Sequence, residues 1–218
     1  MHKNEEHGHS RKQFQIDRIA FFSDAVIAIA LTLMILEVRI PELGADISIR
    51  EVFARYGGSM LLHGLALLIA FWTIGNLWMR HHALFEGIVN YNEMFVRVNL
   101  FFLFTVMLLP ISISFLFRNN EPFNFKMFFY FGNLFFASFT FSALLYIVFS
   151  SKNRFSSLTD PVKVREIKDN SYLGTGVFLL TMILILLNIK FFWIAFLLIP
   201  FSKALFRAKK KAALKKMR

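Results

Sequence analysis

The chain has 218 residues, of which 56% are hydrophobic and 17% are aromatic, and its mean hydropathy is +0.54. Its long apolar runs exclude a soluble domain and a disordered chain, and they indicate one membrane domain with polar tails. The absence of cysteine excludes a disulfide framework and a thiolate metal site, while the net charge of +11 needs either a topological explanation or an anionic partner.

The first apolar segment follows a polar start. Residues 1–12 are polar and contain histidine, so we expect no cleavable signal peptide and a cytoplasmic tail over residues 1–16. From residue 17 to residue 40 the sequence predicts a helix that is long enough to cross a bilayer core of roughly 30 Å, and Pro41 ends it. This helix opens a membrane domain that we expect to extend over residues 17–207.

One face of this helix carries an apolar stripe. Residues three, four and seven positions apart stack along one side of a helix. The stripe consists of Ala25, Ile29, Thr32 or Leu33, and Leu36. Aliphatic stripes on membrane helices are usually packing residues, and spacing alone favours that interpretation over the lining of a conduit.

A polar pair, Ser23 and Asp24, lies at the entrance of the same helix. A carboxylate inside a membrane helix costs about 2.5–3.5 kcal/mol on insertion scales, so Asp24 should face protein or water and have a partner. Arg18, six residues earlier, is the nearest candidate for that partner. The alternative is an ordinary signal-anchor helix whose first turn is polar because it has not yet left the headgroups.

Five further membrane spans follow in the sequence. They cover residues 52–78, 95–117, 125–149, 172–187 and 191–206. Pro110 should kink the third predicted span because it removes a backbone donor. In the basic connector over residues 151–170, Asp160 followed by Pro161 predicts a turn. The short link over residues 188–190 predicts that the last two spans form an antiparallel helix hairpin.

The distribution of Lys and Arg predicts the orientation of the chain. The N-terminus, alternate connections and the C-terminal residues 203–218, which include the basic tail over residues 208–218, hold 19 of the 25 basic residues. Because cytoplasmic loops are enriched in such residues, we expect a multi-pass protein of the cell membrane with both termini cytoplasmic. Nucleic-acid binding is the rival interpretation of the basic tail. Its position directly after a membrane span instead favours topology and attraction to anionic membrane lipids.

The entrance of the first helix also carries a recognisable motif. Arg18, Phe22, Ser23 and Asp24 are spaced as Arg-x-x-x-Phe-Ser-Asp and are followed by a helix of Ala, Ile, Leu and Thr. This pattern resembles the signature of the transmembrane protein 175 family, which comprises lysosomal potassium channels and their prokaryotic relatives. The resemblance is specific over the first three spans. The last three match only in hydropathy and length.

The same resemblance points to two residues on the next helices. In the family pattern a Trp is followed three residues later by a His and then by Leu-Phe, and His81 is the match. Asn99 matches a buried Asn of the family. If the helices pack together, these two residues join Arg18, Ser23 and Asp24 in a structural network of hydrogen bonds near the cytoplasmic end.

A metal site at the adjacent histidines is not expected. His81 and His82 would point to different sides of a helix, which makes them a poor metal pair. The alternative to the network is a pair of interfacial histidines just outside the bilayer. We therefore expect neither a metal nor a cofactor, with potassium only as the permeant ion.

The fold class implied by the resemblance is an all-α integral membrane protein with six transmembrane helices per subunit. The signature occurs once per chain, and one pore helix cannot surround a conduit, so symmetric assembly is required. The resemblance implies a homotetramer whose pore is lined by the first helix. It also implies a filter of bulky aliphatic rings, with Ile29 as the constriction and Thr32, Leu33 and Leu36 further outward.

The predicted function is a potassium-permeable, cation-selective channel. No Thr-Val-Gly-Tyr-Gly filter loop and no arginine-repeat voltage sensor occurs in the sequence. The alternative is a proton-coupled secondary transporter that uses Asp24 and His81, although such proteins usually show interrupted helices, inverted repeats and a midplane site. An enzyme is not expected, because no Gly-x-Ser-x-Gly motif, His-Glu-x-x-His motif or pair of intramembrane carboxylates is found.

Overall fold

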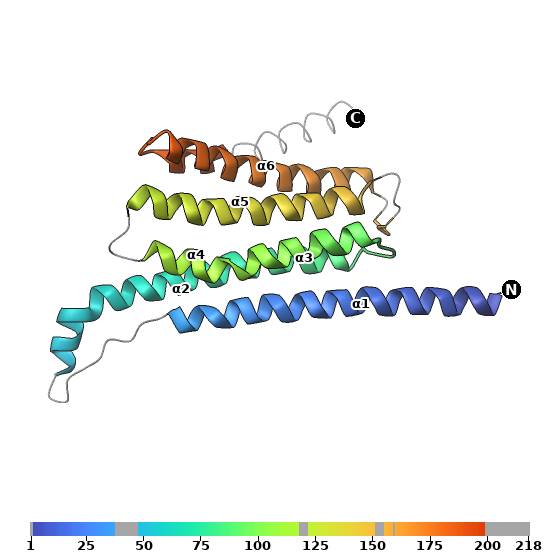
Figure 1. Cartoon of the computed structure of the whole chain (residues 1–218), viewed down its shortest axis with the longest axis horizontal. Coiled ribbons are helices and arrows are strands. Elements are labelled where there is room, and N and C mark those ends of the chain that lie inside the picture. Colours follow the sequence, from blue (N-terminus) through green and yellow to red (C-terminus); the bar gives the residue numbers. More distant parts are fainter. Residues whose placement is uncertain (1, 38–47, 118–121, 151–154, 159, 199–218) are drawn as a thin grey trace, which may run out of the picture.

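Helices make up nearly all of the described part of the chain, and they lie side by side along a common direction (Figure 1). The computed structural model describes residues 2–37, 48–117, 122–150, 155–158 and 160–198. The elements are, in chain order, α1 (His2–Leu33), the 3-10 helix η1 (Met34–Glu37), α2 (Ile49–Phe85), α3 (Glu93–Met107), α4 (Leu109–Leu116), α5 (Phe123–Val148), α6 (Pro161–Leu186) and the 3-10 helix η2 (Phe192–Leu197).

Within the described residues, four helical stretches are long and apolar enough to cross a membrane. They are Ile49–Phe85, Glu93–Leu116, Phe123–Val148 and Pro161–Leu186, so α3 and α4 together make one span. The apolar part of α1 begins beside three charged residues, Asp17, Arg18 and Asp24, and continues into η1. The sixth predicted span, over residues 191–206, is described only as far as 198. Six spans per subunit therefore stay a prediction.

The ends of α1 differ from the sequence prediction. The helix begins at His2 rather than near residue 17, because hydropathy locates a membrane span and not the polar helical turns that precede it. Regular α-helix ends at Leu33 and the chain tightens into η1. The predicted stop at Pro41 lies outside the described residues.

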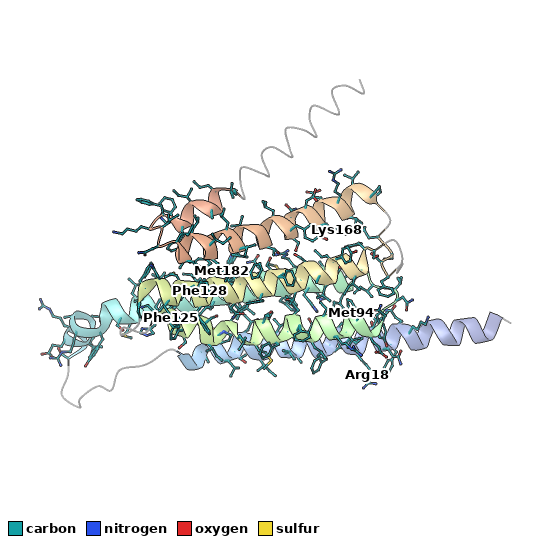
Figure 2. All side chains as sticks on the ribbon, turned by 45° about the horizontal axis from the view of Figure 1, so that its top comes forward. Arg18, Met94, Phe125, Phe128, Lys168 and Met182 are labelled. Carbon is teal, nitrogen blue, oxygen red and sulfur yellow. The ribbon has the colours of Figure 1, made fainter. Side chains whose placement is uncertain are left out.

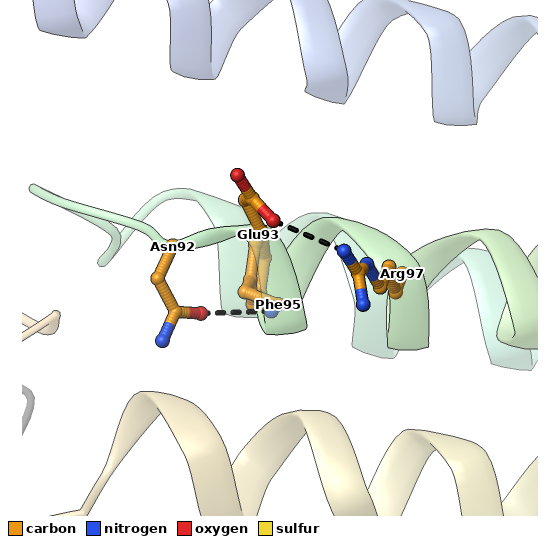
Figure 3. A network of polar contacts seen from close by, with 4 residues as sticks. All are labelled: Asn92, Glu93, Phe95 and Arg97. Carbon is orange, nitrogen blue, oxygen red and sulfur yellow. Dashed lines mark hydrogen bonds and ion pairs between the residues drawn. The ribbon is translucent and has the colours of Figure 1, made fainter.

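Side-chain caps start α2 and α3. Ser48 and Glu51 form a reciprocal capping box, in which each side chain accepts a hydrogen bond from the other residue's backbone N–H. Asn92 accepts from the Phe95 N–H at 2.9 Å and begins α3, as Figure 3 shows. Arg97 lies one turn into α3 and pairs with Glu93 at 3.0 Å.

The predicted interruption near Pro110 is present. Helix α3 ends at Met107 and α4 begins at Leu109, with Pro110 in the first turn of α4. Proline has no N–H to donate to the preceding turn, so the ladder is broken there. The hydrogen bond from the Ser112 N–H to the Leu108 carbonyl, at 3.0 Å, resumes it.

Helix α6 begins well before the predicted fifth span. Asp160 accepts hydrogen bonds from the N–H groups of Val162 and Lys163, at 2.9 and 3.4 Å, and Pro161 occupies the first helical position. The pair Asp-Pro therefore starts a helix here, as an N-cap followed by proline at N1. The prediction of a connector extending to residue 170 was wrong.

The chain reverses direction after α6. Asn188 has a positive φ of 58°, its N–H bonds to the Ile185 carbonyl, and the Ile189 N–H bonds to the Leu184 carbonyl, both at 2.9 Å. This is the Schellman arrangement, in which Asn is among the few residues that tolerate the left-handed conformation. It returns η2 against α6, which is the described part of the predicted hairpin.

The connections gather at two ends of the bundle. The N-terminal ends of α1, α3 and α6 lie at one end, and the C-terminal end of α4 and the N-terminal end of α5 lie at the other (Figure 1). The α2–α3 connection also pairs with residues 155–158, which lie between α5 and α6. The Val89 N–H bonds to Phe155 O and the Ser157 N–H bonds to Gly87 O, both at 2.8 Å. In Figure 2, Lys168 lies toward this end and Phe125 toward the opposite one.

Candidate functional site

A buried chain of hydrogen bonds joins three helices at the entrance of α1. The Asn99 amide on α3 donates through Nδ2 to Ser23 Oγ at 2.9 Å, and its Oδ1 lies 2.8 Å from His81 Nε2 on α2. Ser23 also donates to the Ile19 carbonyl of its own helix at 2.8 Å. All three side chains are at most 1% exposed. The amide oxygen can only accept, so His81 Nε2 carries the proton.

Aromatic rings enclose His81. It stacks on Phe102 with ring centroids 5.1 Å apart and lies 4.5 Å from the ring of Phe85. Its neighbour His82 is exposed, stacks on Trp78 and lies 3.7 Å from Glu86. The two adjacent histidines therefore face different environments. His81 is a buried, hydrogen-bonded member of the bundle and not an interfacial residue.

Asp24 has a partner that the sequence did not indicate. Its Oδ1 accepts a hydrogen bond from the indole N–H of Trp78 at 2.8 Å. Among the described residues no hydrogen bond or ion pair joins Asp24 to Arg18, since residues six positions apart do not face each other on a helix. The Trp could have been found, because it stands three residues before His81 and shares its helical face.

Arg18 and Phe22 lie on an exposed side of α1. Arg18 points away from the bundle (Figure 2) and lines an open cavity of about 410 Å³ together with Gln15, Phe22, Tyr91 and other residues. The structure thus brings Ser23, His81 and Asn99 into one network, places Asp24 beside it, and leaves Arg18 outside it.

The stripe predicted to line a pore is uncovered within the subunit. Ile29 is 54% exposed, and Thr32 and Leu33 are also exposed. Thr32 donates its hydroxyl proton to the Ile29 carbonyl at 2.9 Å. The side chain of Leu36 lies outside the described residues. The opposite side of the helix is buried in the core, through Ile16, Ser23, Ile27, Ala30 and Met34.

Comparison with known proteins shows that the part of the chain holding this arrangement is similar to one family. Residues 18–110 match the family model described as endosomal/lysosomal potassium channel TMEM175, a range that contains the whole network. A potassium channel of Chryseobacterium sp. (strain P1-3) is 34% identical over 95 residues, which are 44% of this chain and 45% of the relative. One from Streptomyces collinus is 32% identical over 101 residues, with 43% of each chain covered. The chain spans less than half the length of these curated relatives.

The structural comparison extends the likeness beyond residue 110. The crystal structure of a lysosomal potassium-selective channel TMEM175 homolog from Chamaesiphon minutus matches with a TM-score of 0.64 and 25% identity. The match covers 90% of this chain and 97% of the homolog. Over residues 18–110 the chain is similar to the TMEM175 family. A crystal structure of the potassium channel MtTMEM175 matches this chain in fold, with a TM-score of 0.66 at 19% identity over 89% of this chain and 93% of that one.

The chain has a second set of polar contacts, between α2, α5 and α6, that the sequence did not indicate. Ser142 of α5 lies 2.8 Å from Ser171 and 3.0 Å from Thr175 on α6, and Arg80 of α2 donates to Ser171 at 3.1 Å. Ser and Thr side chains often hydrogen-bond across membrane helices. No spacing in the sequence indicates which of them meet, because they lie on different helices.

Proposed function

We propose that this chain forms a potassium-permeable, cation-selective channel in which copies of α1 surround the conduit. The observation that carries the proposal is the division of α1 into a buried side and an uncovered aliphatic side. Ile27 and Ala30 are fully buried, whereas Ile29, between them in the sequence, is 54% exposed. The curated relatives that match are named potassium channels, which supports the same function and not an enzymatic one.

The direction of the uncovered side is fixed by the network. Ser23 can reach Asn99 only if it faces α3, and successive helical residues are about 100° apart. Ile29, six residues later, then lies about 240° around the helix from Ser23. The hydrogen bonds therefore hold the aliphatic side away from the subunit's own core, where it is available to other copies of α1.

A ring of Ile29 side chains would act as a hydrophobic constriction that gates by dewetting. Thr32 lies just beyond it. Its hydroxyl proton is donated to the Ile29 carbonyl, so its oxygen lone pairs are left to face a partly dehydrated cation. Leu33 and Leu36 extend the lining outward.

Assembly as a homotetramer follows from one signature per chain together with the family resemblance. The N-terminal end of α1 lies at the same end of the bundle as the N-terminal end of α6 (Figure 1), which carries Lys163, Arg165 and Lys168. This basic end supports a cytoplasmic position for the N-terminus in a cell membrane, and an even number of spans would place the C-terminus on the same side. Membrane lipids and potassium ions are the partners that this arrangement requires.

Flux measurements in liposomes test the proposal. Purified protein under a potassium gradient should pass potassium, and replacement of potassium by sodium should reduce the flux. Ile29→Asn should weaken this selectivity, because an amide ring holds water in the constriction. The matched control is Ile69→Asn on α2, since Ile69 is also 54% exposed. An unchanged reversal potential in Ile29→Asn would refute Ile29 as the filter.

The transporter alternative is not favoured. Asp24 and His81 make separate hydrogen bonds, to Trp78 and to Asn99, instead of forming one proton-coupling pair. Saturable uptake by assembled protein, with no ion-selective current, would be the result expected of a transporter.

A further inference from the structure

A second cavity lies in the bundle, away from α1. It has a volume of about 490 Å³ and lies between α2, α5 and α6, where the paired connections at the end of the bundle close it. Its walls are mainly apolar, and they include Leu84 from α2, Phe141 and Leu145 from α5, and Leu173 and Phe178 from α6. No Asp or Glu is among the residues that line it.

One arginine enters this apolar cavity. The Arg80 guanidinium lies 4.6 Å over the ring of Phe141 and donates to Ser171 at 3.1 Å. These contacts hold the planar group in place, while a guanidinium has five N–H groups in all. Arg80 is exposed in the subunit, so within a membrane its charge would be costly unless an opposite charge or several hydrogen bonds compensated it. The cavity offers Arg80 no carboxylate, and the geometry of its N–H groups suits bidentate binding of a phosphate.

Arg80 of α2 meets α6 at the level expected for the membrane interface. Residues 161–170 of α6 are largely polar and charged, and residues 172–187 are almost entirely apolar. Ser171, which Arg80 contacts, stands at the boundary between them. Asn170 lines the cavity on the charged side of this boundary, and Lys168 donates to the Phe149 carbonyl on its wall at 3.2 Å. Figure 2 shows Lys168 at the same end of the bundle.

We propose that this cavity binds the headgroup of an anionic phospholipid. The phosphate lies against Arg80 and Asn170, and an acyl chain follows the apolar walls toward Leu173 and Phe178. Basic pockets between transmembrane helices are known to bind anionic headgroups in this way. A phospholipid headgroup and free phosphate both offer a phosphate anion to Arg80. Only a phospholipid also has acyl chains that can contact the apolar walls.

The test is lipid binding to the purified full-length protein in detergent, measured by native mass spectrometry and by thermal unfolding. The probes are dioleoyl phosphatidylglycerol, dioleoyl phosphatidylcholine and inorganic phosphate. Phosphatidylglycerol should bind best and raise the Tm. Arg80→Gln should weaken its binding about tenfold, as expected for the loss of a charge-assisted hydrogen bond. Arg97→Gln is the matched control, because Arg97 is exposed and pairs with Glu93 on the surface of α3.

A second variant covers the case in which Arg80→Gln does not fold. Ala83→Phe fills the cavity from an exposed wall position and leaves Arg80 intact, and it too should weaken phosphatidylglycerol binding. Wild-type binding in both variants would overturn the proposal. So would equal stabilisation by inorganic phosphate, which would indicate a site for free anions. The readout is binding and not flux, so its failure is distinguishable from a failure of the channel proposal.

Discussion

Replacement of Asn99 by alanine removes the side chain that connects three helices. Its amide bonds to Ser23 and to His81 at 2.9 and 2.8 Å, and all three groups are buried. Ser23 keeps its bond to the Ile19 carbonyl, so the group left without a partner is the His81 N–H. A buried donor without a partner costs about 1–3 kcal/mol, and the void left by the amide adds to this. We expect Asn99→Ala to lower the free energy of unfolding by about 2–4 kcal/mol.

The assay is equilibrium unfolding of the purified protein in mixed micelles, compared with Asn76→Ala. Within the part of the chain that the structure describes, the Asn76 amide bonds to the Trp72 carbonyl of its own helix, at 2.6 Å, and to no other helix, so its loss separates no described helices. Hydrogen bonds between membrane helices average only about 0.6 kcal/mol in double-mutant cycles. The larger value expected here reflects the orphaned His81 and not the bond itself. If Asn99→Ala is no more destabilising than Asn76→Ala, the network does not hold the helices together.

Three further predictions concern single groups. Trp78→Phe keeps the ring but removes the donor to Asp24, and it should lower the free energy of unfolding by about 1–3 kcal/mol in the same assay. Asn188→Gly should lower the Tm less than Asn188→Ala, because both lose the hydrogen bond from Asn124 Nδ2 but the φ of 58° suits glycine and not alanine. The chain has no cysteine, so Ile29→Cys and Ala30→Cys each introduce a single thiol. A membrane-impermeant thiol reagent should label Ile29→Cys and not Ala30→Cys, and equal labelling would contradict an aqueous pore on that side.

Hydropathy predicted the spans in α2, α3–α4, α5 and the apolar part of α6 because apolar length is a local property of the sequence. It could not predict where helices start outside the bilayer. The polar turns at His2 and Pro161 are helical but carry no apolar signal. Asp160 and Pro161 suit both a turn and a helix start, and only the helix that follows decides between them.

The candidate site could be predicted only in part. Ser23 and Asn99 are 76 positions apart, and their contact came from the family resemblance and not from spacing. Closeness in sequence was misleading for Arg18, because side chains six positions apart on a helix, such as Arg18 and Asp24, do not face each other. The signal for Trp78 was present, since a Trp near the membrane needs a partner for its N–H and this one shares a face with His81.

The polar network fixes the rotation of α1 about its own axis, which apolar packing alone could not do. Inside a membrane, lipid tails and apolar side chains are similar surroundings, so apolar contacts do not select one rotation of a helix. The bond between Ser23 and Asn99 does, because it forms at a single rotation of α1. A rotation by one residue, about 100°, would replace Ile29 on the uncovered side with Ala28 or Ala30. A large aliphatic side chain at the proposed constriction would then give way to a methyl group. In the proposed channel, the rotation set at Ser23 would therefore determine the width of the pore at Ile29.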